Sequence, residues 1–224
     1  MTYKRIVIFL NLYNLFKKIY HKLFGKYKHC LLYLLSKEID DEWTILDVGC
    51  GRCSPLKEIK KESYKVGLDH YEPYISKSKE QSIHNKYVLG DVRALPFKYK
   101  TFECAIATEV LEHLNKEDGL KMLQEMERVA KRKIILTTPN GFLRTYAGPE
   151  DNPEETHLCG YTVDELKKIG FKVYGFNGLK VLWTIRNGKA VLRFRVYILF
   201  VYLSGVFVYY FPQFAFQLFF FKKM

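Results

Sequence analysis

The sequence predicts an α/β fold in which a mostly parallel sheet carries helices on both faces. Short apolar runs alternate with segments of helical periodicity from residue 41 onward, which is typical of consecutive β-α units. The first run, 44–48, leads into Gly49 and Gly51, and Ser54-Pro55 then supplies the cap and the first residue of a helix. The 224 residues suffice for one domain of this kind with a full core.

The remaining elements follow in chain order. Apolar residues recur every three or four positions over 116–130, which predicts an amphipathic helix. A Thr-x-x-Glu capping box begins the helix over 162–169. Residues 141–157 lack periodicity, and a loop of this length is uncommon unless it is functional or mobile. In total we expect strands at 44–48, 65–68, 86–89, 102–107, 133–137, 171–176 and 214–221, and helices at 55–61, 73–82, 116–130, 162–169 and 196–211.

The last part of the chain, 196–221, has no charged residue, and on length alone it is long enough to span a membrane. Pro212 divides this stretch. Residues 196–211 are apolar all round, as in a helix buried in protein or lipid, whereas the Phe-rich residues 214–221 suit a central strand. We therefore predict an apolar helix followed by a final strand of the sheet, with transmembrane insertion and attachment of the helix to a membrane surface as alternatives.

The positive charge belongs to the two ends of the chain. The net charge is +12, yet residues 41–171 hold 20 basic residues against 22 acids. Residues 1–40 hold eight basic residues and two acids, and residues 172–224 hold eight basic residues and no acid. Basic charge interleaved with apolar side chains, as in 6–16, suits a helix on an anionic membrane surface. We divide the chain into a helical, basic and aromatic extension, 1–40, and a domain over 41–224. The extension is interpreted as a cap over the mouth of the site, as a membrane contact, or as both.

Cysteine usage indicates a reducing compartment. Five cysteines without paired spacing do not make a disulfide framework. The stretch 6–16 lacks a small-residue cleavage site and is too short to span a bilayer, so we expect no signal peptide. We expect a cytoplasmic protein whose basic ends can meet the inner face of a membrane.

Three acidic residues surround the glycine turn. Asp47 precedes Gly49 at the end of the first strand, Asp69 ends the second strand, and Asp91 follows the third. A carboxylate at the end of the second strand can accept both hydroxyls of a ribose. Glycines let the backbone approach a bound molecule closely, and the helix start beyond them offers free N–H groups. The pattern predicts a site for a nucleotide-sized ligand.

Five stretches of the sequence, taken together, resemble the class I S-adenosylmethionine-dependent methyltransferases of the type 11 branch. They are ILDVGCGRCS, VGLDHYEP, GDVRALPF, CAIATEVLEHL and TTPNG, in the order and spacing of the family. The resemblance covers about 44–176, and we expect it to include the final strand through Lys223. It implies a Rossmann-like, seven-stranded sheet, S-adenosylmethionine as cofactor, and methyl transfer as the reaction.

The resemblance also implies roles for single residues. Cys53 is a departure, because a third glycine is common there in the family. Cys50 and Cys53 have Cys-x-x-Cys spacing, but the chain has no second pair to complete a zinc site, and we predict no metal there. The predicted cofactor contacts are Asp47, Gly49 and Gly51 for the methionine part, Asp69 for the ribose, His70, Asp91 and Val92 for the adenine, and Thr108 and Glu109 beside the sulfonium.

The segment after the fourth strand carries the candidate catalytic residues. If this segment turns helically, Glu109, Glu112 and His113 fall on one face, and His157 of the later loop can join them. A carboxylate or imidazole there can take the proton of a hydroxyl acceptor. We predict catalytic roles for Glu112, His113 and His157. A divalent metal ion is an open alternative, since the set resembles metal sites of some O-methyltransferases; so is a structural or positioning role for Glu112-His113.

The predicted function is methyl transfer to oxygen or carbon of a small or lipid-linked acceptor, because apolar, basic ends favour an amphiphilic substrate. Two alternatives remain. An RNA or other nucleic-acid methyltransferase would use the basic ends as phosphate contacts, although the Asn-Pro-Pro-aromatic motif of amino-methylating enzymes is absent after the fourth strand. A non-catalytic module would bind S-adenosylmethionine without turnover. The expected partners are the acceptor and an anionic membrane surface.

Overall fold

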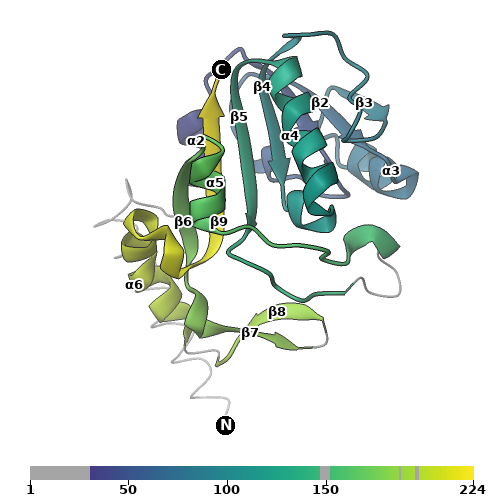
Figure 1. Ribbon diagram of the computed structural model, residues 1–224. Helices are drawn as coiled ribbons and strands as arrows, with labels where there is room; N and C mark the ends of the chain where they lie inside the picture. Colours follow the sequence, from purple (N-terminus) through teal and green to yellow (C-terminus); the bar gives the residue numbers. More distant parts are fainter. Residues whose placement is uncertain (1–30, 147–151, 187, 195–196) are drawn as a thin grey trace.

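The computed structural model describes residues 31–146, 152–186, 188–194 and 197–224. Most of the predicted extension, 1–30, lies outside the described residues. The described part contains a seven-stranded sheet with the strand order β3-β2-β1-β4-β5-β9-β6 (Figure 1). Its strands are β1 (Thr44–Val48), β2 (Tyr64–Asp69), β3 (Lys86–Leu89), β4 (Phe102–Thr108), β5 (Ala130–Pro139), β6 (Lys172–Leu179) and β9 (Ala215–Lys223).

The sheet is parallel except for its last strand. Strands β1 to β5 pair in parallel with their neighbours, whereas β9 lies antiparallel between β5 and β6. The Phe-rich C-terminal segment therefore completes the sheet from its interior, where Leu218, Phe219 and Phe220 are buried. The predicted seven-stranded, mostly parallel sheet is confirmed.

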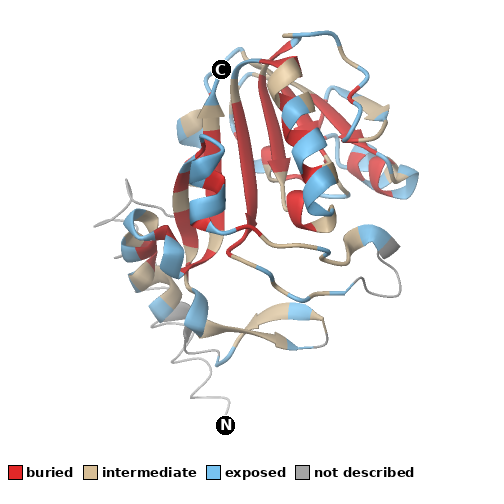
Figure 2. Ribbon diagram, in the orientation of Figure 1, coloured by how far each residue is buried: buried red, intermediate tan, exposed pale blue. Residues whose placement is uncertain are grey.

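Alternate residues of the strands face two hydrophobic layers. On one face, Leu46 and Leu68 pack with α4 and α5; on the other, Ile45 and Ile106 pack with α2 and with a short 3-10 turn that follows β1. Figure 2 shows the buried strands between these partly exposed helices. Helices on both faces are thus confirmed. The helices are α2 (Leu31–Glu38), α3 (Glu72–Glu80), α4 (Lys116–Val129), α5 (Val163–Lys168) and α6 (Tyr197–Tyr210).

The described part of the predicted extension packs on the sheet. Leu34 and Leu35 of α2 and the following Ile39 are buried in the layer formed with Ile45 and Ile106. No residue of α2 lines the site cavity described below. Residues 31–40 therefore cover a face of the sheet and not the mouth of the site.

The predicted helix over 55–61 is shorter than expected. Ser54 caps it as predicted, by accepting a hydrogen bond from the Leu56 N–H at 3.1 Å, but only the 3-10 turn Pro55–Glu58 forms. Ile59 leaves the turn in an extended conformation and is buried against the sheet. Burial of this side chain directly after the turn ends the helix early.

A two-stranded hairpin, β7 (Trp183–Arg186) with β8 (Lys189–Leu192), was not predicted. It lies below the carboxyl ends of the parallel strands in Figure 1. Trp183 anchors the hairpin to the sheet, because its ring stacks on Phe216 of β9 with centroids 4.3 Å apart. Trp183 is thus a packing residue.

Helix α6 lies close against β6 because two glycines give it room. A Cβ at Gly175 would lie less than 3.0 Å from the Val208 carbonyl oxygen and the Ala215 Cβ. A Cβ at Gly178, which also has a φ of +68°, would lie 2.8 Å from the Val201 Cα. The predicted helix before Pro212 is confirmed. No helix within the described ranges has the length and apolarity that crossing a membrane requires.

We expect Gly175→Ala to destabilise the protein by about 1–3 kcal/mol, because the added methyl group must push α6 away from β6. Thermal unfolding of the two variants Gly175→Ala and Gly90→Ala measures this. Gly90 is the control, since the nearest atoms to a Cβ there all belong to side chains, the Leu68 Cδ1 at 3.1 Å and two Pro96 ring carbons at 3.6 Å. Equal melting temperatures for the two variants would contradict the close packing.

Candidate functional site

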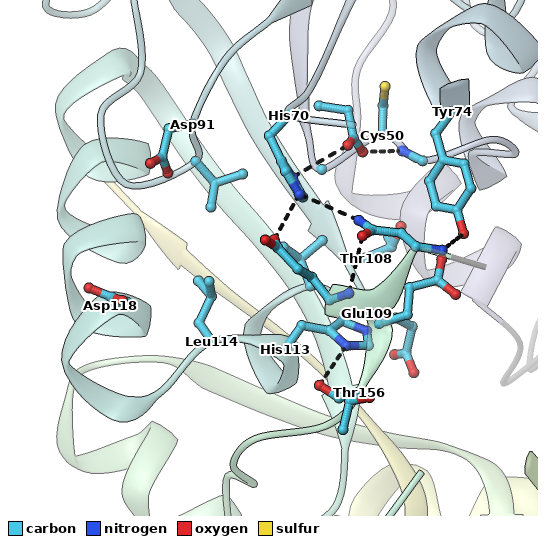
Figure 3. Close-up of a pocket in the computed structure, with 18 of the residues that line it drawn as sticks. Cys50, His70, Tyr74, Asp91, Thr108, Glu109, His113, Leu114, Asp118 and Thr156 are labelled. Atoms are coloured by element: carbon cyan, nitrogen blue, oxygen red, sulfur yellow. Dashed lines mark hydrogen bonds and ion pairs between the residues drawn. The ribbon is translucent and has the colours of Figure 1, made fainter. Parts of the chain in front are cut away.

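A cavity of about 750 Å³ opens at the carboxyl ends of β1, β2 and β4. Figure 3 shows His70 near its centre, with Asp91 and Asp118 on one side and Tyr74 on the other. Carboxyl ends of parallel strands are where open α/β sheets bind their ligands. Of the predicted site residues, the cavity is lined by Gly49, Gly51, Asp69, His70, Asp91, Val92, Thr108, Glu109 and His113. It is not lined by Asp47, Glu112 or His157.

The glycine turn forms one wall of the cavity. Gly49 has a φ of +68°, and a Cβ there would lie 2.7 Å from the Val110 Cγ2. Gly51 has a φ of +57°, and a Cβ there would meet no atom within 4 Å. Gly49 is therefore required by the packing of the chain on itself, whereas Gly51 presents bare backbone to open space, as a cofactor cradle needs.

Asp69 ties this turn to the start of α3. Its Oδ2 accepts a hydrogen bond from the Gly51 N–H at 2.8 Å, and its Oδ1 accepts one from the Tyr71 N–H at 2.9 Å. The carboxylate is buried yet lines the cavity. Each oxygen retains a second lone pair, which can accept a ribose hydroxyl.

Asp91 lines the cavity with its carboxylate already engaged. Arg93 donates from Nε to Oδ1 at 2.9 Å and from Nη2 to Oδ2 at 2.7 Å, and Asp118 accepts from the third guanidinium nitrogen at 3.2 Å. Hydrogen bonding by Arg93 lowers the pKa of Asp91 below its usual range. Asp91 is therefore ionised and fixed in orientation. Its predicted contact with adenine stays a prediction.

Asp47 does not reach the cavity. Side chains alternate along a strand, and Asp47 shares the face of Ile45, opposite to that of Leu46. There its Oδ2 lies 2.8 Å from the Nε2 of His84, and both side chains are fully buried. The direct cofactor contact that the resemblance implies is thus replaced by a buried pair behind the glycine turn.

Glu109 lies at the cavity edge in a strained conformation. Its φ is +55°, which side-chain-bearing residues rarely adopt. Its carboxylate accepts from the Thr137 hydroxyl at 2.8 Å and from the Gln217 amide at 2.7 Å. The condition for placing Glu109 on one face with Glu112 and His113 is not met, because only Leu111–His113 forms a 3-10 turn. The cause is the left-handed backbone at Glu109, which directs its side chain toward β5 and β9.

Glu112 is buried with one oxygen unsatisfied. Its Oε2 accepts from the Thr138 hydroxyl at 3.0 Å, and its Oε1 has no hydrogen-bond partner in the described structure. Burial, and then the negative charge of Glu109, raise the pKa of Glu112 well above its usual range. An unsatisfied buried carboxylate oxygen is costly, and it marks a place where a proton or a cation would be favoured.

Two imidazoles lie beside Glu112. The rings of His113 and His157 meet edge to face with centroids 4.9 Å apart. The Nδ1 of His113 lies 3.4 Å from the Thr156 carbonyl oxygen, and that of His157 lies 2.7 Å from the Leu143 carbonyl oxygen. Because a carbonyl can only accept, each Nδ1 carries the hydrogen and each Nε2 keeps a lone pair.

Both imidazoles favour the neutral form. Burial lowers the pKa of His113, and burial together with the nearby His113 lowers the pKa of His157 to about 4. One ligand atom each of Glu112, His113 and His157 lies within 4.8 Å of the others. A carboxylate with two neutral imidazoles, each held through Nδ1 by a backbone carbonyl, is a donor set that fits a divalent metal ion.

The 152–158 segment lines the cavity and makes contacts that the sequence did not predict. The Asn152 N–H donates to the Tyr74 hydroxyl at 2.9 Å, and Glu154 Oε2 lies 2.8 Å from the Nε2 of His70. Burial raises the pKa of Tyr74 to about 12. The loop is therefore tied to residues at the start of α3, beside the predicted adenine and ribose contacts.

Comparisons with known proteins match this architecture. Residues 46–137 match a family model described as a methyltransferase domain. A solved S-adenosylmethionine-dependent methyltransferase from Methanosarcina mazei superposes with a TM-score of 0.56 at 14% identity, over 85% of this chain and 96% of that one. The [4+2]-cyclase SpnF superposes with a TM-score of 0.55 at 14% identity, over 86% and 80%. Residues 46–137 therefore match the type 11 family of S-adenosylmethionine-dependent methyltransferases, and the solved structures share the fold of the described chain.

One curated relative aligns with more of the chain than the residues 46–137 that the family model matches. The sterol 24-C-methyltransferase erg-4 of Neurospora crassa is 24% identical over 183 residues, which cover 78% of this chain and 44% of that protein. The chain spans less than half the length of the curated relatives that it matches.

We expect the contribution of His157 to the free energy of unfolding to fall as the pH is lowered from 6.5 toward 4. In this window the unfolded chain binds a proton at His157 that the folded chain, with a pKa of about 4, does not bind. Chemical denaturation at several pH values measures the slope of the unfolding free energy against pH in the wild-type protein and in His157→Asn. This variant, which can still donate to the Leu143 carbonyl, should lack the part of the slope that His157 contributes. An unchanged slope would contradict burial of a neutral imidazole.

Proposed function

We propose that the protein transfers the methyl group of S-adenosylmethionine to an oxygen or carbon atom of a small or lipid-like acceptor. The observation that carries this proposal is the wall made by Gly51 and Asp69. It joins bare, positive-φ backbone to a buried carboxylate at the end of β2. Such a wall fits the methionine and ribose parts of the cofactor, within the family to which the domain belongs.

The residues of this chain have to position the cofactor more than activate it. The sulfonium of bound S-adenosylmethionine supplies an already activated methyl group. Asp69 would orient the ribose, and His70 and Val92 would border the adenine. Thr108 and Glu109, at the end of β4, would border the position from which the methyl group leaves. Alignment and exclusion of water then provide most of the rate.

His113 is the residue best placed to take a proton from the acceptor. It lines the cavity, and its lowered pKa keeps the imidazole neutral and able to accept at neutral pH. Glu112 and His157 lie behind it and do not line the cavity. We therefore assign the base to His113 and positioning or ion-holding roles to the other two.

The set formed by Glu112, His113 and His157 would hold a divalent ion. The unsatisfied Oε1 of Glu112 supports this fit, because a cation would compensate a buried oxygen that has no donor. When bound, such an ion would occupy the Nε2 lone pair of His113, so the ion would replace His113 as the activating group by lowering the pKa of a coordinated acceptor hydroxyl. This part of the proposal favours an oxygen acceptor over a carbon acceptor.

A lipid-like acceptor is supported by two observations. One curated relative is a sterol 24-C-methyltransferase, similar over 78% of this chain. Large apolar side chains are also exposed at Leu158, which lines the cavity, and at Phe142 and Tyr146, in the segment whose Leu143 carbonyl holds His157. Exposed apolar residues beside a cavity are typical of sites for apolar ligands.

Asp69→Ala should weaken S-adenosylmethionine binding about tenfold to a hundredfold, because hydrogen bonds to a charged group contribute about 1.5–3 kcal/mol. Isothermal titration calorimetry measures the dissociation constant. The control is Asp164→Ala, which removes an exposed carboxylate from α5. Equal affinity of Asp69→Ala and the wild-type protein, with both folded by circular dichroism, would contradict the assigned cradle.

Divalent ions should stabilise the wild-type protein and not Glu112→Gln. Titration with Mn²⁺ or Zn²⁺ to about 100 times the dissociation constant should contribute about 2.7 kcal/mol, or about 5–10 °C in Tm. Without metal, the wild-type protein should lose stability as the pH rises above about 4.5, because ionisation of Glu112 is less favourable in the folded than in the unfolded chain. Glu112→Gln lacks this loss and should therefore become more stable relative to the wild type as the pH rises.

Glu117→Gln, on the exposed face of α4, is the matched control for this metal titration. It should keep the full stabilisation by metal. A Tm shift of equal size in Glu112→Gln would show that the ions bind elsewhere. The measurement does not depend on turnover, so it tests the ion site separately from methyl transfer.

A further inference from the structure

Helix α6 presents an apolar stripe to the surface. Leu203, Phe207 and Tyr210 are exposed at helical spacing, and Phe211 and Phe214 continue the stripe beyond the helix. The exposed fractions of these five side chains lie between 44% and 61%. Figure 2 shows α6 at the lower left, with exposed positions along its outer side. A contiguous apolar patch of this kind marks an interaction surface.

The other side of α6 is fixed to the domain. Val208 is fully buried, and Gly175 and Gly178 of β6 allow the helix backbone to approach the strand. The stripe also has internal order, because Phe207 packs on Phe211 with centroids 4.9 Å apart and on Phe214 with centroids 5.6 Å apart. The helix therefore offers one defined apolar face and is held by the other.

The part of the chain that carries the stripe has charge of a single sign. Residues 172–224 contain eight Lys and Arg and no acidic residue. Among them, Arg186 and Lys189 are exposed at the end of the β7–β8 hairpin, and Arg193 is exposed between β8 and α6. A second protein surface with this composition would be repelled, whereas an anionic lipid surface attracts basic residues and admits aromatic side chains.

The stripe and the hairpin are connected to the segment that holds His157 beside the cavity. Asn140, directly after β5, donates through Nδ2 to the Pro212 and Ala215 carbonyl oxygens at 3.1 and 2.9 Å, at the turn that follows α6. A Cβ at Gly188 of the hairpin would lie 3.3 Å from the Tyr146 backbone nitrogen. The same 141–146 segment carries the Leu143 carbonyl that fixes His157.

We propose that the α6 stripe and the basic β7–β8 hairpin dock together on the surface of an anionic lipid bilayer. In this arrangement the stripe enters the headgroup region, and Arg186 and Lys189 of the hairpin contact the lipid phosphates. The 141–146 segment beside the cavity then faces the bilayer. Binding to the bilayer is a separate property of the protein and does not require methyl transfer. The bilayer could also deliver an apolar acceptor to the cavity, and that second role rests on the proposed function.

Vesicle flotation tests the docking with the full chain. The vesicles are phosphatidylcholine alone, or phosphatidylcholine with about 30% phosphatidylglycerol. The wild-type protein should float with the anionic vesicles and bind the neutral ones at least about tenfold more weakly, because the basic residues contribute only with anionic lipid. Equal binding to both vesicles, or no binding to either, would overturn the proposal.

Two pairs of variants locate the surface. Leu203→Ser with Phe207→Ser should weaken anionic-vesicle binding at least about tenfold, whereas Leu120→Ser should not. Leu120 is the control because it is 50% exposed on α4, against 54% for Leu203. Arg186→Glu with Lys189→Glu should weaken binding similarly. Lys60→Glu with Lys98→Glu, which makes the same charge change at exposed positions away from the hairpin, should have a smaller effect.

Two other occupants of the stripe give different results. If a second copy covers it, light scattering will show a dimer that Leu203→Ser with Phe207→Ser dissociates, and vesicle binding will not respond to this change. If residues 1–30 alone bind lipid, their removal will abolish flotation while the stripe variants float normally. Either result overturns the proposal. Calorimetry with S-adenosylmethionine on each variant confirms folding and keeps this outcome separate from that of methyl transfer.

Discussion

The carboxylate of Asp69 is the interaction on which the candidate site depends. It accepts the N–H groups of Gly51 and Tyr71 at once, and so it fixes the glycine turn after β1 relative to the start of α3. Without that tie, the bare backbone at Gly51 would have no fixed partner across the cavity. The parallel sheet brings the carboxyl ends of β1 and β2 together, and the hydrogen bonds of Asp69 fix the backbone there as one wall of the cavity.

The part of the site around His113 is built on Glu112, whose carboxylate is buried with one oxygen unsatisfied in the described part of the chain. The Glu112 backbone carbonyl accepts from the N–H groups of Leu158 and Cys159, which brings His157 across to His113. The same arrangement buries the Glu112 carboxyl group, raises its pKa and lowers the pKa of both imidazoles. A proton on Glu112 or a divalent cation among the three residues would relieve this electrostatic penalty. Sites with opposed pKa shifts of this kind are characteristic of function.

Much of this architecture follows from local sequence signals, and the differences follow from long-range ones. Periodicity and capping predicted the sheet strands, α4 and the final helix and strand, because each carries its own pattern. The placement of Asp47 could have been found from strand alternation with Ile45. The left-handed backbone at Glu109 has no sequence signal, since packing after β4 imposes it. The β7–β8 hairpin was not predicted, although Asn187-Gly188 is a recognised turn signal. Its strands have four residues each and alternate only weakly between apolar and polar side chains, so their sequences resemble those of loops.

We propose that the cradle formed by Gly51 and Asp69 serves methyl transfer. The most direct test of this role incubates the intact chain with S-adenosylmethionine labelled in the methyl group and with a fractionated extract of lipids and small hydroxylated molecules. We expect release of S-adenosylhomocysteine in step with transfer of the label to one acceptor fraction. Tight binding of S-adenosylmethionine with no S-adenosylhomocysteine formed, across all fractions and with Mn²⁺ or Zn²⁺ present, would contradict it and would indicate a module that binds the cofactor without turnover.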